Sequence, residues 1–174
     1  MPSSSAVFPE PSPKAPAPPT DSLDPRTTVG TVRLTVSDLA RSRAFYERAL
    51  GLQAVERGDG GFDLAAPGQP HALVELHENA SAPALDHRAT GLFHLALLFP
   101  TRADLAAALA RLAQVRWPLQ GASDHLVSEA LYLGDPDGHG IELYRDRPRE
   151  QWPRRDGTIE MATLPLDLDD LLRA

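Results

Sequence analysis

The chain has 174 residues, a formal net charge of −7, 42% hydrophobic residues and no cysteine. The acidic balance argues against non-specific nucleic-acid binding, which needs a basic surface to neutralise phosphates. Without cysteine there are no disulfides, thiolate ligands or cysteine nucleophiles, so any metal site must use nitrogen and oxygen donors. No apolar run approaches the roughly 20 residues of a membrane span, and the first residues lack the pattern of a secretory signal. We therefore expect a soluble, cytoplasmic protein.

Residues 1–27 are predicted to form a disordered or extended tail. Eight of the 17 prolines fall in this stretch, and proline disfavours both helix interiors and sheet ladders. We expect an inert leader, with a docking or swapping arm as the alternative.

The following segment predicts a strand, a helix and three more strands. The run TVRLTV at 31–36 is alternating and β-branched, which indicates a strand. The stretch 37–50 carries apolar residues at helical spacing, with Ser37 expected as its cap and Gly51 as its left-handed terminator. Glycines and prolines then separate three short strand candidates at 52–57, 61–67 and 71–78.

Residues 78–91 show no periodic spacing of apolar residues and are predicted to form a linker. After this linker, the same order of elements repeats. The run GLFHLALLF at 91–99 predicts a strand buried on both faces. The stretch 101–114 predicts a helix that begins with a capping box of Thr101 and Asp104. Three further strand candidates follow at 116–122, 127–135 and 140–146.

The duplicated order predicts an α+β fold. Two βαβββ units, at about 28–78 and 91–148, are expected to form one domain at 28–148, because neither unit can bury a sheet face alone. Side by side, they would form an open barrel with helices outside and one cleft inside. We expect 149–174 to be a C-terminal tail or linker with a short final helix, packed on the domain or involved in dimerisation.

His94 and Glu142 are the first candidates for a functional site. His94 falls in the strand that opens the second unit and Glu142 in the strand that closes it, both with apolar neighbours. A carboxylate in an apolar strand is costly unless it is paired or metal-bound. An imidazole and a carboxylate on one face suit Fe(II), Mn(II), Zn(II) or Ni(II). The alternatives are a hydrogen-bonded core histidine and a carboxylate at the rim of the cleft, paired with an arginine such as Arg33.

Three further residues are candidates for chemistry. Glu75 lies in an apolar strand at the end of the first unit and is either a third ligand or an exposed glutamate. His125 is a candidate acid or base, because histidine titrates near neutrality. Tyr132 is a candidate hydrogen-bond donor to a substrate oxygen. Ordinary loop or core placement is the alternative for both.

The chain resembles the vicinal-oxygen-chelate superfamily of glyoxalases, bleomycin-resistance proteins and extradiol dioxygenases. TVRLTVSDLARSRAFYERALGL is similar to the opening strand and helix of the family, and DPDGHGIELY to its closing turn and strand. More narrowly, HLVSEALYLGDPDGHGIE at 125–142 resembles the extradiol dioxygenase fingerprint, with a departure at Ser123. The stretch from 91 onward is similar to the first module of two-module catechol 2,3-dioxygenases of the Bacillus type.

This resemblance implies a metal-dependent extradiol ring-cleaving oxidoreductase that acts on a catechol-like small molecule. His94 and Glu142 would match two ligands of the metal. The expected metal is Fe(II), with Mn(II), Ni(II) or Zn(II) as the alternatives. His125 would assist proton transfer, and Tyr132 would lie beside the substrate oxygen. The remaining ligand of these relatives is a histidine in the first strand, where this chain has Thr31.

Other functions within the same superfamily stay open. Glyoxalase-type lyase or isomerase chemistry would use Glu75, which matches the position of a further glutamate ligand. A resistance-type module would bind a small molecule without turnover, which Thr31 favours. The chain also ends where a second module would begin in the relatives, so a homodimer or a separate second module could complete the site.

Overall fold

The computed structural model describes residues 23–24, 26–83, 85–86, 88 and 90–174. Most of the predicted tail at 1–27 lies outside these residues. The first unit is a βαβββ arrangement whose strands form one sheet in the order β1-β4-β3-β2, with β1 and β4 parallel. Its elements are β1 (Val32–Val36), α1 (Leu39–Arg48), β2 (Gln53–Glu56), β3 (Phe62–Ala65) and β4 (Ala72–Glu78).

The ends of α1 follow from local hydrogen bonding. The prediction that Ser37 caps this helix was wrong, because Asp38 accepts a 2.9 Å hydrogen bond from the backbone N–H of Arg41 instead. Asp38 is one residue closer to the first turn, and its carboxylate reaches the free N–H groups there. Gly51 terminates the helix as predicted, with φ of 78°, a conformation in which glycine has no steric cost.

The second unit repeats the order of the first. It forms a sheet in the order β11-β6-β7-β8-β5, in which β11 (Leu164–Pro165) comes from the C-terminal segment and β5 and β8 are parallel. Thr101 caps α2 as predicted, since its hydroxyl accepts from the Asp104 N–H at 3.1 Å, but the Asp104 carboxylate accepts from this hydroxyl at 2.6 Å and not from the Thr101 backbone N–H of a capping box. The elements are β5 (Leu95–Leu98), α2 (Arg102–Gln114), β6 (Gly121–Asp124), β7 (Ser128–Gly134) and β8 (Gly140–Asp146).

Two strand predictions in this unit were wrong. The strand expected at 91–99 begins only at Leu95 and is not buried on both faces, because β5 is at the edge of its sheet and Leu98 is 57% exposed. The strand expected at 116–122 begins only at Gly121. Arg116 has φ of 55°, and the Trp117 indole donates to the Gly134 carbonyl at 2.9 Å. The apolar residues there pack as a loop.

The C-terminal segment packs on the second unit. Strand β11 pairs antiparallel with β6, and the expected short helix is α3, whose Leu171 is fully buried. Arg102 of α2 forms a 2.7 Å ion pair with Asp170 of α3. The elements after β8 are η1 (Arg149–Gln151), β9 (Arg154–Arg155), β10 (Thr158–Ile159), β11 (Leu164–Pro165) and α3 (Leu168–Leu171).

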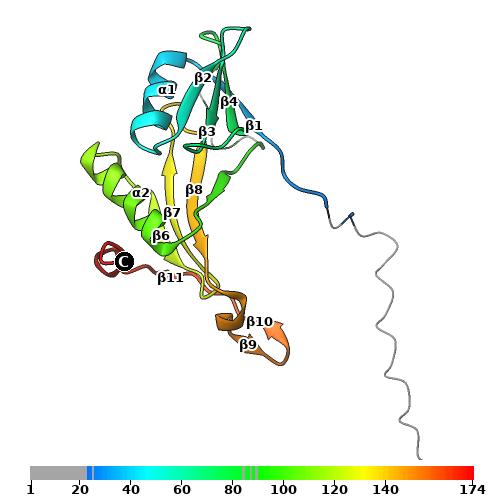
Figure 1. Cartoon of the computed structure of the whole chain (residues 1–174), viewed down its shortest axis with the longest axis vertical. Helices are drawn as coiled ribbons and strands as arrows, with labels where there is room; N and C mark the ends of the chain where they lie inside the picture. The colour runs from blue at the N-terminus through cyan, green and yellow to red at the C-terminus, as the bar shows by residue number, and fades with distance from the viewer. Residues whose placement is uncertain (1–22, 25, 84, 87, 89) are drawn as a thin grey trace, which may run out of the picture.

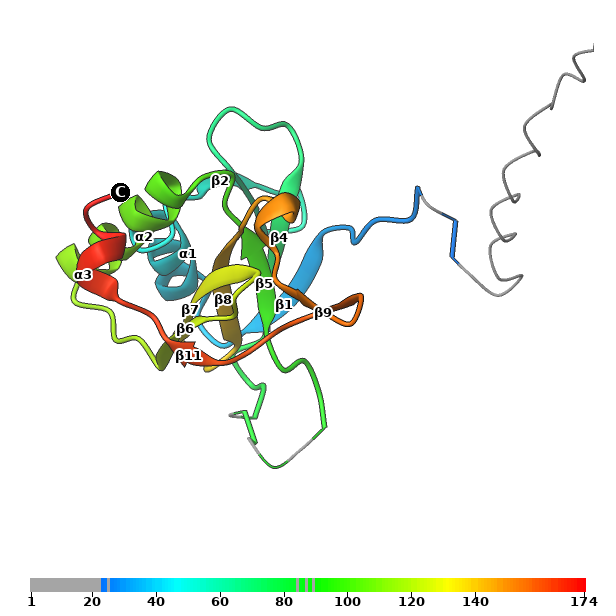
Figure 2. The same cartoon turned by 90° about the horizontal axis from the view of Figure 1, so that it is seen from below.

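Helices α1 and α2 lie together on one side of the molecule and the sheets on the other, as both views show (Figure 1, Figure 2). The α+β class and the repeated units are confirmed, whereas closure of the sheets into an open barrel stays a prediction. Within the described part of the chain, every helix is too short or too polar to cross a membrane.

The turn between β7 and β8 contacts the first unit through hydrogen bonds and an ion pair. Its buried Asp135 accepts from the Tyr46 hydroxyl at 3.1 Å and from Nδ1 of His139 at 2.9 Å. Its Asp137 accepts from the hydroxyl of Ser37 and forms a 2.9 Å ion pair with Arg41. The turn that leads into β8 is therefore fixed against α1 of the first unit.

Candidate functional site

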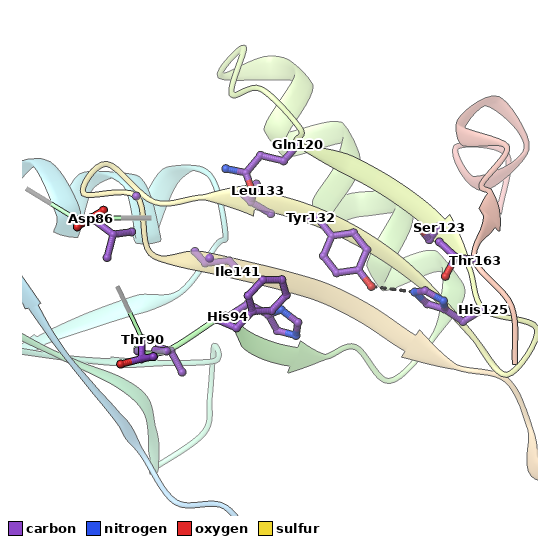
Figure 3. Close-up of a pocket in the computed structure, with 16 residues that line it drawn as sticks. Asp86, Thr90, His94, Gln120, Ser123, His125, Tyr132, Leu133, Ile141 and Thr163 are labelled. Carbon is purple, nitrogen blue, oxygen red and sulfur yellow. Dashed lines mark hydrogen bonds between the residues drawn. The ribbon is translucent and has the colours of Figure 1, made fainter. Parts of the chain in front are cut away.

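A cavity of about 1090 Å³ opens beside the sheet of the second unit (Figure 3). Its lining comes from the linker before β5, from strands β6 to β8 and from the C-terminal segment. Apolar side chains form part of the wall, and Leu92 and Phe93 at the rim are 54% and 88% exposed. The polar side chains that line it are Asp86, Thr90, His94, Gln120, Ser123, His125, Tyr132 and Thr163.

His94 and Glu142 lie next to each other. His94 immediately precedes β5, and β5 pairs with β8 so that Ala96 is opposite Glu142. This register brings Nε2 of His94 to 2.9 Å from Oε2 of Glu142, and both side chains are largely buried.

Gly140 allows this close approach of the two strands. A Cβ at this position would collide with the Phe93 carbonyl oxygen and lie 3.0 Å from the Cβ of His94. Because a larger residue would push the backbone before β5 away from β8, Gly140 fixes the position of His94 relative to Glu142.

Tyr132 and His125 extend the pair into a continuous hydrogen-bonded chain. Tyr132 lies opposite Glu142 in the β7–β8 ladder, and its hydroxyl donates to Oε1 of Glu142 at 2.9 Å. Nε2 of His125 is 2.8 Å from the same hydroxyl oxygen, as the dashed line in Figure 3 marks. On its other side, Nδ1 of His125 is 2.7 Å from the Ala162 carbonyl oxygen.

The environment of Tyr132 keeps its hydroxyl protonated. Burial, and then the hydrogen bond to Glu142 and the charge of that carboxylate, raise the pKa of Tyr132 to about 12. The hydroxyl therefore has a single proton near neutrality, and this proton is shared between two neighbours.

Glu75 lies apart from these four residues. It is opposite Arg33 in the β1–β4 ladder, and its carboxylate accepts from Arg33 at 2.8 Å and contacts Arg57 at 3.1 Å. The hydrogen bond from Arg33 lowers the pKa of Glu75. Across the described residues, no three His, Asp or Glu side chains are grouped closely enough to hold a metal ion. Of the three proposed ligands, the structure thus brings together His94 and Glu142 but not Glu75.

The repeated fold explains why Glu75 has the sequence context of a ligand. Val32 is opposite Val74 in the first unit, as Leu95 is opposite Ile141 in the second. In this register Glu75 corresponds to Glu142, and Thr31 corresponds to His94. The Thr31 hydroxyl donates to the Ala72 carbonyl at 2.8 Å. The first unit thus keeps the carboxylate, but arginines surround it and the imidazole position is occupied by threonine.

The 2.9 Å separation between Nε2 of His94 and Oε2 of Glu142 is that of a direct hydrogen bond between an imidazole and a carboxylate. An imidazole nitrogen and a carboxylate oxygen are also the donor types that Fe(II) and Zn(II) accept. The described residues bring no third His, Asp or Glu side chain to this pair.

Sequence reasoning missed several parts of the site, among them Gln120, Ser123 and the Ala162 carbonyl. Gln120 was assigned to a strand that is a loop, and Ser123 was noted only as a departure from the fingerprint. The Ala162 carbonyl could not be predicted, because the identity of a residue does not show which group its backbone oxygen binds. Only the pairing of β11 with β6 brings it to His125.

Comparisons with known proteins agree on one family. Residues 28–143 match the family described as the glyoxalase/bleomycin resistance protein/dioxygenase superfamily. The chain is 45% identical over 153 residues to a catechol-2,3-dioxygenase of Bacillus subtilis (strain 168), a match that covers 87% of this chain and 53% of the relative. The chain therefore spans about half the length of that relative.

Solved structures show the same fold. A glyoxalase/dioxygenase from Nostoc punctiforme superposes with a TM-score of 0.62 at 21% identity, covering 73% of this chain and 97% of that one. A glyoxylase/bleomycin resistance protein/dioxygenase domain from Frankia sp. EAN1pec superposes with a TM-score of 0.60 at 25% identity, covering 71% of this chain and 94% of that one.

Proposed function

Because this chain belongs to the glyoxalase/bleomycin resistance protein/dioxygenase superfamily, we propose that it is an extradiol dioxygenase-like protein that binds a catechol in its cavity. The observation that carries the proposal is the hydrogen-bonded chain from His94 through Glu142 and Tyr132 to His125. It combines a pair of candidate metal ligands with an acid–base pair, and three of its four members, His94, Tyr132 and His125, line the cavity.

The similarity to a catechol-2,3-dioxygenase suggests a divalent metal cofactor. We assign His94 and Glu142 as its ligands and Fe(II) as the metal, with Mn(II), Ni(II) or Zn(II) as the other candidates. When bound, Fe(II) would supply the redox chemistry that catechol cleavage by O2 requires.

In the proposed reaction, Nε2 of His125 takes a proton from a catechol hydroxyl. The Tyr132 hydroxyl has one proton, so it donates either to His125 or to Glu142. Once Nε2 is protonated, it becomes a donor, and the hydroxyl then donates to Glu142 with its oxygen accepting from His125. Proton uptake by His125 is therefore coupled to the orientation of a group beside the substrate oxygen.

The apolar rim is assigned to the ring of the substrate. Leu92 and Phe93 are exposed beside His94, and the Phe93 ring centroid is 5.1 Å from that of His94. A catechol whose oxygens face His94 and Tyr132 would bring its ring against these side chains, where burial of apolar surface favours binding.

The alternative supported by a specific observation is binding of a small molecule without turnover. Thr31 leaves the first-strand position without an imidazole, and Glu75 is neutralised by arginines. A lyase or isomerase that uses Glu75 is disfavoured for the same reason. A second copy of this chain, or a separate second module, would supply the missing ligand if the site needs one.

Elemental analysis of protein purified without oxygen tests the proposal, beside a His94→Ala variant and a His71→Ala control at a histidine outside the cavity. Near-stoichiometric iron in the wild type and the control, lost from His94→Ala, would support it. Cleavage of catechols by the iron-loaded protein would then support the proposed dioxygenase activity directly. Absence of metal from all three proteins, with catechol still bound, would establish the binding function instead.

A further inference from the structure

We propose that the C-terminal segment 160–172 is a positioning element of the site, which fixes the tautomer of His125 through the backbone carbonyl of Ala162. The inference rests on the proposed function, in which Nε2 of His125 is the base. The segment would then be part of the machinery around the cavity and not merely a linker after the domain.

The hydrogen bonding of Ala162 assigns the proton on the ring. Nδ1 of His125 is 2.7 Å from the Ala162 carbonyl oxygen, and a carbonyl oxygen can only accept. Nδ1 therefore carries a proton, and in the neutral ring Nε2 does not. This leaves Nε2 as the basic nitrogen, and it is the nitrogen that faces Tyr132.

The backbone of the two residues is also paired. The Ala162 N–H donates to the His125 carbonyl at 3.4 Å, and the His125 N–H donates to the Ser128 carbonyl at 2.8 Å. Directly after Ala162, Thr163 lines the cavity, and Leu164 is opposite Asp124 in the β11–β6 ladder. Backbone pairing at the Ala162 N–H and at Leu164 thus holds the carbonyl beside His125.

Side chains further along the segment attach it to the second unit. Leu171 is fully buried, and Leu166 and Leu168 pack partly buried against the same core. Arg102 binds Asp170 and also the carboxylate of Glu129, which is 3% exposed. Apolar contacts and an ion pair therefore hold the segment against the second unit. These contacts lie away from the imidazole that the segment orients.

Release of the segment would remove the only protein acceptor that Nδ1 has among the described residues. The neutral ring could then carry its proton on either nitrogen. In the Nε2-protonated form, the ring would donate to Tyr132 and could not take a proton from substrate. Release of the segment is therefore expected to change which nitrogen of His125 carries the proton. This change would occur although the altered residue does not contact the cavity.

Two neighbouring leucines provide a matched test in the full-length chain. Leu171→Ala removes a fully buried side chain, whereas Leu172→Ala changes a leucine that is 48% exposed. Nitrogen-15 NMR of the histidine ring, at a pH where the imidazole is neutral, reports the tautomer of His125. We expect the Nδ1-protonated form in the wild type and Leu172→Ala, and a mixture of both tautomers in Leu171→Ala.

A second variant provides the test if Leu171→Ala does not fold. Ala162→Pro removes the N–H that donates to His125 and leaves the buried leucine in place. Amide hydrogen exchange at Leu164 of β11, and at residues 171 and 172, whose N–H groups bond within α3, shows whether the segment has been released in either variant. A released segment with mixed tautomers supports the proposal; a released segment with His125 still protonated only on Nδ1 overturns it. A segment that stays docked while the tautomer changes also overturns it.

The tautomer does not depend on turnover. If the protein neither binds iron nor cleaves catechol, the proposed function fails while the NMR result still decides whether the segment orients His125. If catechol is cleaved but the variants keep the wild-type tautomer, the positioning role fails alone.

Discussion

A single methyl group at Gly140 should disturb the pair of His94 and Glu142. The Cβ of Gly140→Ala would collide with the Phe93 carbonyl and approach the Cβ of His94 to 3.0 Å, where ordinary contacts between carbons are about 3.5–4.0 Å. Backbone must move, because neither obstacle is the end of a flexible side chain. Overpacking of this kind costs about 1–3 kcal/mol, which corresponds to a fall in melting temperature of roughly 2–12 °C.

Gly121→Ala is the matched control for this change. Gly121 also lies in a strand of the same sheet, but a Cβ there would meet only the Tyr132 ring, at 4.0 Å. We expect its stability to stay within about 0.5 kcal/mol of the wild type. Thermal unfolding and iron binding should be measured for both variants. Equal melting temperatures and equal iron binding in the two would refute the claim that Gly140 sets the position of His94.

Three further predictions follow from the hydrogen bonds of the site and of the turn. Tyr132→Phe should keep the fold but lower catechol cleavage by about 10²–10⁴-fold, the usual range for acid–base groups; an unchanged rate would argue against the coupled hydroxyl. Tyr46→Phe removes a buried bond to Asp135 and should cost about 1–3 kcal/mol in chemical denaturation, whereas the half-buried Tyr144 changed to Phe should cost less. The hydrogen bond to Asp135 raises the pKa of His139 above its ordinary value of 6.5, so the folded protein holds this proton more tightly than the unfolded chain. The resulting stability is present below pH 6.5 and is lost as the pH rises through the raised pKa. The difference in unfolding free energy between wild type and His139→Gln should therefore shrink from acidic to alkaline pH, and a constant difference would contradict this assignment.

Much of the architecture was predictable because it depends on local patterns. The bounds of β8 agree with the prediction at 140–146, since alternating residues between a glycine turn and a charged end define a strand. His94 and Glu142 were predictable as a pair, because polar groups in apolar strands need partners and parallel strands of one unit lie side by side.

Features that depend on register or on backbone atoms could not be predicted in this way. The difference between Glu75 and Glu142 rests on which residue lies opposite, and only the β1–β4 register brings Arg33 to Glu75. The strand expected at 116–122 begins only at Gly121, because Trp117 lies in a loop and its indole binds the Gly134 carbonyl at the end of β7. The partner of His125 is a backbone oxygen of a segment whose short strands have few sequence signals.

The contact between α1 and the β7–β8 turn has a consequence for the order in which the chain folds. Helix α1 can form from local interactions, but its partners lie far along the chain: Asp135 is 89 residues beyond Tyr46, and Asp137 is 96 residues beyond Arg41. Such distant pairs close large loops and slow the folding step that needs them. During synthesis, the face of α1 that binds the turn stays uncovered until the second unit has emerged. The first unit should therefore gain its final stability only late, when the hairpin of the second has formed.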